Sequence, residues 1–208
     1  MSFYLMRSDK FIFIPYNLLA IDFEFITTKV IKNKAKKYIQ EIVEVGLIFR
    51  TENLVEEYSG IVRPRYFLES KNKYKNSTYS EKFDYKEIEN GMDLEQIFEK
   101  IKKIYIPKET VWISWGKAEY DALKKVCREY DIAIPLPKED HLDLSVEFKE
   151  FYKLNQNVSL DKALSILNIS IEERHKALPD AKALMDIINR MFADGYKIDD
   201  KQLKYLEY

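Results

Sequence analysis

The apolar residues of this 208-residue chain follow strand periodicity at first and helical periodicity later, and this order limits the folds it can adopt. Three early segments are short, apolar and partly alternating, which predicts an antiparallel meander: 17–26, 41–49 and 58–62. The β-branched and aromatic run Thr110–Trp115 predicts a further strand. Five other segments are predicted to be helices: 94–105, 121–130, 143–152, 160–167 and a last helix that carries the apolar stripe 184–191 and has Pro179 in its first turn. Strands first and helices interleaved later indicate a mixed-sheet α/β domain flanked by helices.

Two of the predicted helices begin with capping side chains. Asp93 and Gln96 have the spacing of a capping box, and Ser159 is predicted to be an N-cap. The polar segment 63–90 is long for a connection, which favours a functional or mobile loop. The lysine-rich run Lys32–Lys37 is expected to be a loop between the first two strands.

Composition excludes several classes of protein. With 46% hydrophobic and 33% charged residues, the chain is neither a membrane protein nor a disordered one. A net charge of −1 is unfavourable for binding a long duplex but compatible with an enzyme that holds a few nucleotides. The single cysteine, Cys127, excludes an internal disulfide, and a cytoplasmic location is expected. Residues 1–16 include only a short apolar run, so we expect no signal peptide.

The domain organisation is predicted to be simple. Residues 17–208 are expected to form a single domain, and 1–16 an extension that adds an edge strand or a contact in a homodimer.

Asp22 and Glu24 lie inside the first predicted strand. Residues i and i+2 of a strand point to the same face, so the two carboxylates project together, while Phe23 lies on the opposite face. Two acids on one face of an apolar strand repel each other and lose hydration, and a bound cation removes both penalties. An edge strand with ordinary surface acids is the alternative.

Asp121 is the second candidate, at the start of the helix that follows the strand Thr110–Trp115. Ligands in α/β proteins bind at the carboxyl ends of strands. A carboxylate that interacts only with the helix dipole is the alternative. Glu119 competes for the same role, but Tyr120 is expected to anchor the turn in the core just before Asp121.

His175 and Asp180 form the third candidate. Pro179 disfavours helical geometry at Leu178, so His175 is predicted to lie in a loop and Asp180 in the first turn of the next helix. A loop imidazole and a first-turn carboxylate can face one pocket. A surface histidine is the alternative for His175, whereas His141, which lacks such a partner pattern, is interpreted as structural.

Together these motifs resemble those of the DEDDh 3′–5′ exonucleases of the RNase H-like superfamily, over residues 17–192. The resemblance implies an RNase H-like sheet, with a three-strand antiparallel meander plus parallel strands. Ser114-Trp115-Gly116 and Phe23-Glu24-Phe25 are most similar to a branch with bacterial sporulation-kinase-inhibitor-like and RNA-trimming exonucleases.

The resemblance also implies roles for the candidate residues. Asp22, Glu24, Asp121 and Asp180 would hold two Mg²⁺ or Mn²⁺ ions, since oxygen-only ligation argues against zinc. His175 would accept a proton from the attacking water as general base, and activity would rise with pH as histidine loses its proton. Phe25 and Ile26 match the positions that contact the terminal nucleotide, although alternation places Phe25 on the core face.

The substrate is less constrained. A Thr-Gly-Ile element that helps many relatives grip a 3′ end has no clear match, and Thr78-Tyr79-Ser80 is the nearest candidate. In the 63–90 segment, basic and aromatic residues alternate irregularly: Lys71, Lys73, Tyr74, Lys75 and Tyr79. This composition suits the binding of single-stranded nucleic acid, but it is equally typical of a solvated loop.

The expected partner is therefore the 3′ end of single-stranded RNA or DNA, with the choice between them open. Two other functions stay open: a regulatory protein with little turnover, and an RNase H-type endonuclease.

Overall fold

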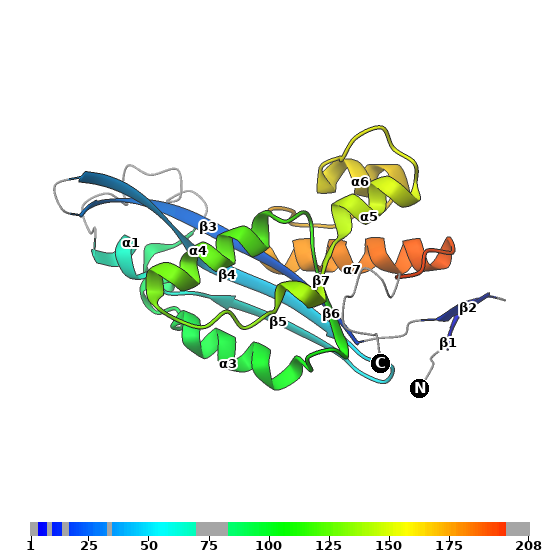
Figure 1. Cartoon of the computed structure of the whole chain (residues 1–208), viewed down its shortest axis with the longest axis horizontal. Helices are drawn as coiled ribbons and strands as arrows, with labels where there is room; N and C mark the ends of the chain where they lie inside the picture. Colours follow the sequence, from blue (N-terminus) through cyan, green and yellow to red (C-terminus); the bar gives the residue numbers. More distant parts are fainter. Residues whose placement is uncertain (1–3, 8–9, 14–16, 33–34, 70–82, 199–208) are drawn as a thin grey trace.

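The computed structural model describes residues 4–7, 10–13, 17–32, 35–69 and 83–198. A five-stranded sheet, in the order β5-β4-β3-β6-β7, lies at its centre (Figure 1). Its strands are β3 (Asn17–Lys32), β4 (Ala35–Arg50), β5 (Val55–Ile61), β6 (Thr110–Ser114) and β7 (His141–Asp143). The first three form an antiparallel meander, and β6 and β7 continue the sheet with parallel pairing. This confirms the predicted mixed sheet.

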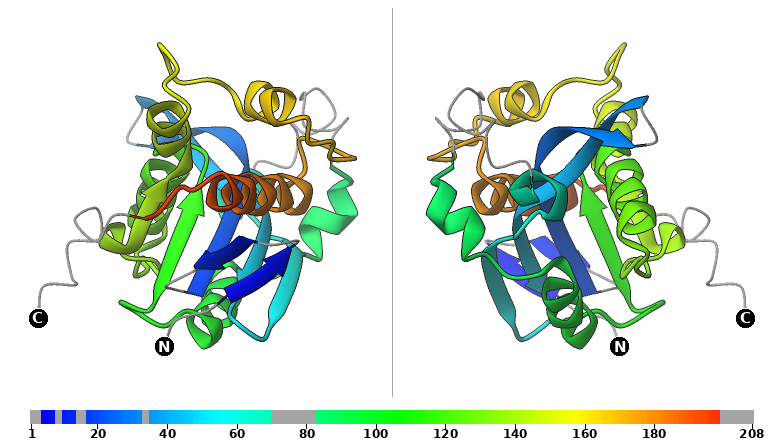
Figure 2. Two further views of the ribbon diagram at one scale, coloured as in Figure 1. Left: turned by 90° about the vertical axis from the view of Figure 1, so that its right-hand side faces the viewer. Right: turned by 90° about the vertical axis from the view of Figure 1, so that its left-hand side faces the viewer.

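Helices cover both faces of the sheet (Figure 2). On one face, α7 (Ala177–Ala193), α5 (Leu144–Phe151) and α6 (Leu160–Leu167) share a core with Leu18 and Ala20 of β3. On the other, α3 (Leu94–Ile104) and α4 (Ala118–Tyr130) pack against Leu19, Ile21 and Phe23. The alternation of β3 therefore separates the two cores, and Asp22 and Glu24 fall on the α7 side.

The predicted helix starts are largely confirmed. Asp93 and Gln96 form a capping box at α3, and the side chain of Ser159 accepts a hydrogen bond from the Lys162 N–H at α6. One prediction was wrong: α7 begins at Ala177, so Leu178 is helical in spite of Pro179. Proline is tolerated there because the first turn of a helix needs no N–H donor at that position.

The hairpin of β3 and β4 is longer than predicted. β3 reaches Lys32 and β4 resumes at Ala35, so the expected loop over Lys32–Lys37 is mostly strand. β5 pairs with β4 only from Glu44 onwards, and β6 pairs with β3 only up to Ala20. Among the described strands, the outer part of the hairpin thus pairs only with itself, and it extends past the end of α4 as an arm, with α1 beside it (Figure 1).

The remaining segments lie around this core. Two short helices, α1 (Arg65–Glu69) and α2 (Tyr85–Glu89), lie within the long connection, and a 3₁₀ turn spans Lys138–Asp140. The lysine- and tyrosine-containing stretch of that connection, with Thr78-Tyr79-Ser80, lies outside the described residues.

The first two strands, β1 (Tyr4–Arg7) and β2 (Lys10–Phe13), pair in a separate two-stranded sheet, so they do not add an edge strand to the main sheet. Within the described ranges, no helix is both long enough and apolar enough to cross a bilayer.

Candidate active site and metal centre

Three predicted carboxylates meet between β3 and α7. Asp22 and Glu24 project from β3, and Asp180 is buried in the first turn of α7. One oxygen atom from each of the three lies within 4.8 Å of the others. We call Asp22, Glu24 and Asp180 the acidic cluster. Its donor set consists only of carboxylate oxygens, the ligand type that Mg²⁺ and Mn²⁺ prefer.

Close packing of backbone against backbone brings the cluster together. Gly46 of β4 is the cross-strand partner of Asp22, and a Cβ atom at Gly46 would lie 2.1 Å from the carbonyl carbon of Ala177. No side chain fits there. Glycine at this position therefore lets the first turn of α7, which carries Asp180, lie directly on the sheet beside Asp22.

The electrostatics of the cluster favour a cation. Burial, first, and the nearby carboxylates of Glu119, Glu24 and Glu44 together raise the pKa of Asp22 to about 8, against the lowering effect of Arg174. A carboxyl group with so high a pKa holds its proton at neutral pH unless a positive charge replaces that proton. The residues therefore fit a divalent cation.

Glu119, at the start of α4, is near enough to Asp22 for its charge to raise the pKa of Asp22. Burial raises the pKa of Glu119 to about 7, and the negative charge of Asp143 contributes to the rise. Its Oε2 atom is buried and has no hydrogen-bond partner among the described residues. A buried carboxylate oxygen without a donor is costly, and a cation next to it would remove that cost.

Asp121 does not join the cluster. It is solvent-exposed on α4, and it is absent from the charged groups that shift the pKa of Asp22. Residues two apart on a helix point roughly 200° apart, so Asp121 points away when Glu119 points in. Of the two carboxylates of α4, Glu119, which the sequence offered as the competitor of Asp121, is therefore the one whose charge acts on Asp22.

His175 lies before α7, as predicted, but its imidazole faces outward. Its backbone N–H donates a hydrogen bond to Oδ1 of Asp180 over 3.2 Å, which holds the loop against the cluster. The side chain is 73% exposed, and its Nε2 atom lies 4.0 Å from Oδ2 of Asp161. Its φ of 67° lies in the left-handed region, which is uncommon for residues with a side chain.

Arg174 is the residue that sequence reasoning missed. Its guanidinium forms an ion pair with Asp180 and a second one, of 2.8 Å, with Asp161 of α6, and the side chain is only 16% exposed. A positive charge thus already lies against the acidic cluster. The only sequence signal was its position next to His175.

Other candidates have structural roles. Ile26 is fully buried in a core cluster with Phe67 and Ile88, and Phe25 packs on the α3–α4 side with Phe23. The expectation that these side chains contact the terminal nucleotide does not fit this placement, because alternation and a register shift after Glu24 turn them into the cores. His141 stacks on Trp112 with ring centroids 4.0 Å apart, consistent with a structural histidine.

Two solved nuclease structures have a similar fold. The nuclease domain of 3′hExo, a DEDDh family member bound to rAMP, has a TM-score of 0.69 at 18% identity, over 88% of this chain and 96% of that one. A 3′-exonuclease described in 3′-end-specific recognition of histone mRNA stem-loop has a TM-score of 0.67 at 17% identity, over 86% of this chain but only 65% of that one. These likenesses show that the chain has the RNase H-like fold of these nuclease domains.

Comparison with known sequences identifies the family to which the chain belongs. No family-level sequence model matches the chain. Over 193 residues, however, it is 30% identical to the "Probable 3'-5' exonuclease KapD" of Bacillus subtilis (strain 168), with 92% of this chain and 88% of that protein covered. The chain belongs to the DEDDh family of 3′–5′ exonucleases, whose members are metal-dependent nucleases of the RNase H-like fold.

Proposed function

We propose that this exonuclease removes nucleotides from the 3′ ends of single-stranded nucleic acid by two-metal hydrolysis, with His175 as general base. The acidic cluster supports this most strongly, because Asp22, Glu24 and Asp180 offer three carboxylate oxygens within 4.8 Å of one another. We assign the catalytic domain to residues 17–208 and treat 1–16 as an extension.

The cluster residues would hold two Mg²⁺ or Mn²⁺ ions. Asp22, Glu24 and Asp180 supply the ligands, and we propose Glu119, in preference to Asp121, as the fourth carboxylate. Its buried, unpartnered Oε2 atom supports this choice. Two divalent ions in such a site activate the attacking water and stabilise the leaving 3′-oxygen of an in-line displacement.

His175 would accept the proton of the attacking water. Its backbone N–H donates a hydrogen bond to Asp180, which supports this role, and the proposal requires the exposed imidazole to rotate about Cα–Cβ from Asp161 towards the cluster. Removal of the imidazole should therefore reduce turnover and leave the binding of the metal ions intact.

A single-stranded 3′ end is the substrate that the chain suits best. With a net charge of −1, the protein lacks the excess of basic residues that binding of a long duplex requires. The structurally similar 3′hExo nuclease domain was solved with rAMP, which is consistent with a ribonucleotide end. RNA and DNA should therefore be compared directly.

The test uses matched RNA and DNA oligonucleotides, labelled at the 5′ end, with Mg²⁺ or Mn²⁺. A ladder of products shortened from the 3′ end is expected, with no cleavage of a circular substrate. Asp22→Asn should abolish the ladder, and His175→Ala should weaken it by roughly 10²- to 10⁴-fold. Asp194→Asn, on the distal end of α7, is the control.

Wild-type rates in Asp22→Asn would refute the mechanism, and cleavage of the circle would indicate an endonuclease. A regulatory protein on the same fold would show neither cleavage nor a rise in thermal stability with Mn²⁺.

A further inference from the structure

The outer part of the β3–β4 hairpin carries a concentrated positive charge. We call residues 27–32 and 35–40 the arm. The sequence from 27 to 40 contains five lysines and no acidic residue. Because the whole chain has a net charge of −1, the rest of it carries −6. The arm is thus a basic segment on an otherwise acidic protein, and it is an extension of the strand that carries Asp22 and Glu24.

One face of the arm is covered near the main sheet, and the other face, which we call the exposed face, carries two large exposed side chains. Thr28 and Ile39 form a cross-strand pair on the covered face and are 3% and 2% exposed. On the other face, Ile31 is 76% exposed and Tyr38 is 67% exposed. The register places six side chains on this exposed face: Thr27, Lys29, Ile31, Lys36, Tyr38 and Gln40. It combines basic, aromatic and apolar groups and has no carboxylate.

The arm twists, and this turns its exposed face away from α4, to the side of the sheet on which Asp22 and Glu24 lie. In the main sheet, α4 packs on the side opposite to Asp22 and Glu24. In the arm, the end of α4 meets the face that continues from Asp22 and Glu24: Tyr130 donates a 2.6 Å hydrogen bond to Glu41, and Glu129 pairs with Lys37. The two faces have therefore exchanged sides. The register shift after Glu24 and the strong twist of two-stranded ribbons account for this.

We propose that the exposed face of the arm binds the single strand of nucleic acid that leads to the 3′ end in the active site. This inference rests on the proposed function. Lys36 would contact phosphates, and the ring of Tyr38 would stack on a base, the combination used for single strands without sequence preference. Ile31 is seven residues from Glu24, roughly 23 Å along the strand, so the arm would hold nucleotides upstream of the cleaved one.

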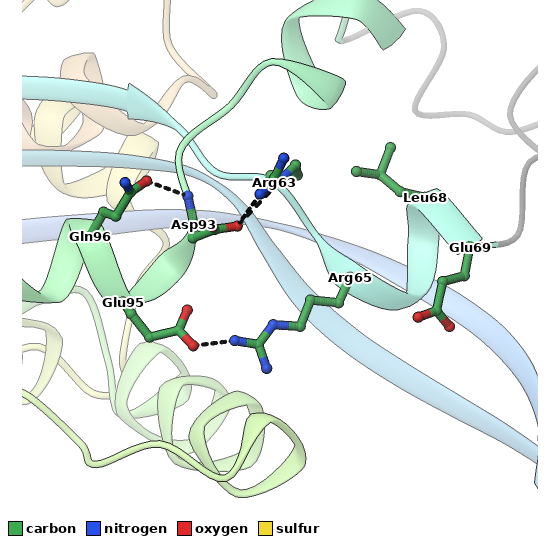
Figure 3. A pocket seen from close by; sticks show the side chains of 7 residues that line it. All are labelled: Arg63, Arg65, Leu68, Glu69, Asp93, Glu95 and Gln96. Atoms are coloured by element: carbon green, nitrogen blue, oxygen red, sulfur yellow. Dashed lines mark hydrogen bonds and ion pairs between the residues drawn. The ribbon is translucent and has the colours of Figure 1, made fainter.

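The hollow between α1 and α3 is a weaker candidate for phosphate binding. It has a volume of about 620 Å³ and contains two arginines, but Arg63 pairs with Asp93 and Arg65 with Glu95 (Figure 3). Both guanidinium groups are thus already neutralised by carboxylates. The six side chains on the exposed face of the arm, by contrast, include no carboxylate.

Binding measurements test the proposal directly. In an Asp22→Asn background, which prevents cleavage, a labelled strand of about 20 nucleotides is titrated and followed by fluorescence anisotropy. Tyr38→Ala should weaken binding roughly tenfold, and Tyr38→Trp should restore it. Lys36→Ala should lower the slope of log K against log salt by about 0.7. Lys103→Ala, an exposed lysine of α3, should change neither.

A trinucleotide serves as the internal comparison, because it is too short to reach from the acidic cluster to the arm. Its affinity should be the same in Tyr38→Ala as in the parent. Equal losses for both lengths, or unchanged binding of the long strand, would overturn the proposal. The proposal would also be overturned if the wild-type protein is a dimer and Tyr38→Ala converts it to monomers. In that case a second copy of the chain covers the exposed face of the arm. Failure of the proposed function would be separate: the wild-type protein would leave both lengths intact.

Discussion

The guanidinium of Arg174 forms an ion pair with Asp180, one of the three carboxylates of the acidic cluster. A second ion pair, of 2.8 Å, joins Arg174 to Asp161 on α6. Arg174 also lowers the pKa of Asp22 through its charge, so the arginine acts on two of the three members of the cluster. In the metal-free protein this side chain supplies part of the positive charge that the carboxylates require.

Arg174→Gln should therefore bind Mn²⁺ more tightly, by roughly three- to tenfold, because the metal no longer competes with the guanidinium. The metal-free variant should also unfold at a lower temperature, since Asp180 loses its ion-pair partner and, within the part of the chain that the structure describes, keeps only the hydrogen bond from the His175 N–H. Isothermal titration calorimetry and thermal unfolding with EDTA or Mn²⁺ measure the two effects. Arg190→Gln, which breaks only an exposed pair with Asp194 on α7, is the matched control. Equal or weaker Mn²⁺ binding in Arg174→Gln would show that the arginine does not compete.

The stability of the metal-free protein should fall as pH rises. Asp22 titrates at about 8 when folded but has a reference pKa of 3.8, so between these values the folded state holds a proton that the unfolded chain has released. The loss should be on the order of 1–3 kcal/mol between about pH 6 and 8. Urea unfolding in EDTA measures it. Asp22→Asn, which cannot titrate, should lose less over the same range, and parallel curves for the two proteins would contradict the assignment.

Glu119 and Asp121 make opposite predictions for activity. Glu119→Gln should reduce the rate on the order of a hundredfold, since a neutral amide is a poor ligand for a divalent ion. Asp121→Asn should stay within about twofold, because this carboxylate is exposed and away from the cluster. The two variants differ from wild type by the same chemical change, two positions apart on α4, so each controls for the other. If Asp121→Asn loses activity in the oligonucleotide assay and Glu119→Gln keeps it, Asp121 and not Glu119 is the fourth carboxylate of the metal site.

Much of the fold followed from the sequence because its signals are local. Strand alternation placed Asp22 and Glu24 on one face, and the side chains of Asp93 and Ser159 marked the starts of α3 and α6. Glu119 was ranked below Asp121 because the point where a helix begins cannot be read to within one residue from composition. α4 begins at Ala118, and a small change in that start decides which carboxylate faces the sheet.

Contacts between distant segments could not be predicted. Glu41 looks like an ordinary strand residue, yet it is fully buried and accepts hydrogen bonds from Thr28, Tyr66, Phe67 and Tyr130. Likewise, nothing in the sequence around Arg174 indicates its pairing with Asp161, thirteen residues away. Such partners depend on tertiary packing, and periodicity carries no information about them.

Gly46→Ala should separate the two halves of the metal centre. An added Cβ would lie 2.1 Å from backbone atoms of both Ala177 and Leu178, so the first turn of α7 must move away from β4, and Asp180 moves with it. We expect a loss of stability of about 1–3 kcal/mol and at least about tenfold weaker Mn²⁺ binding. Gly195→Ala is the comparison: it imposes strain at a φ of 101° but places no atom within 4 Å of its Cβ, far along the chain from the cluster. It should lower stability and leave Mn²⁺ affinity unchanged. If Gly46→Ala lowers stability but binds Mn²⁺ as tightly as Gly195→Ala does, the close approach of β4 and α7 supports the fold and not the metal centre.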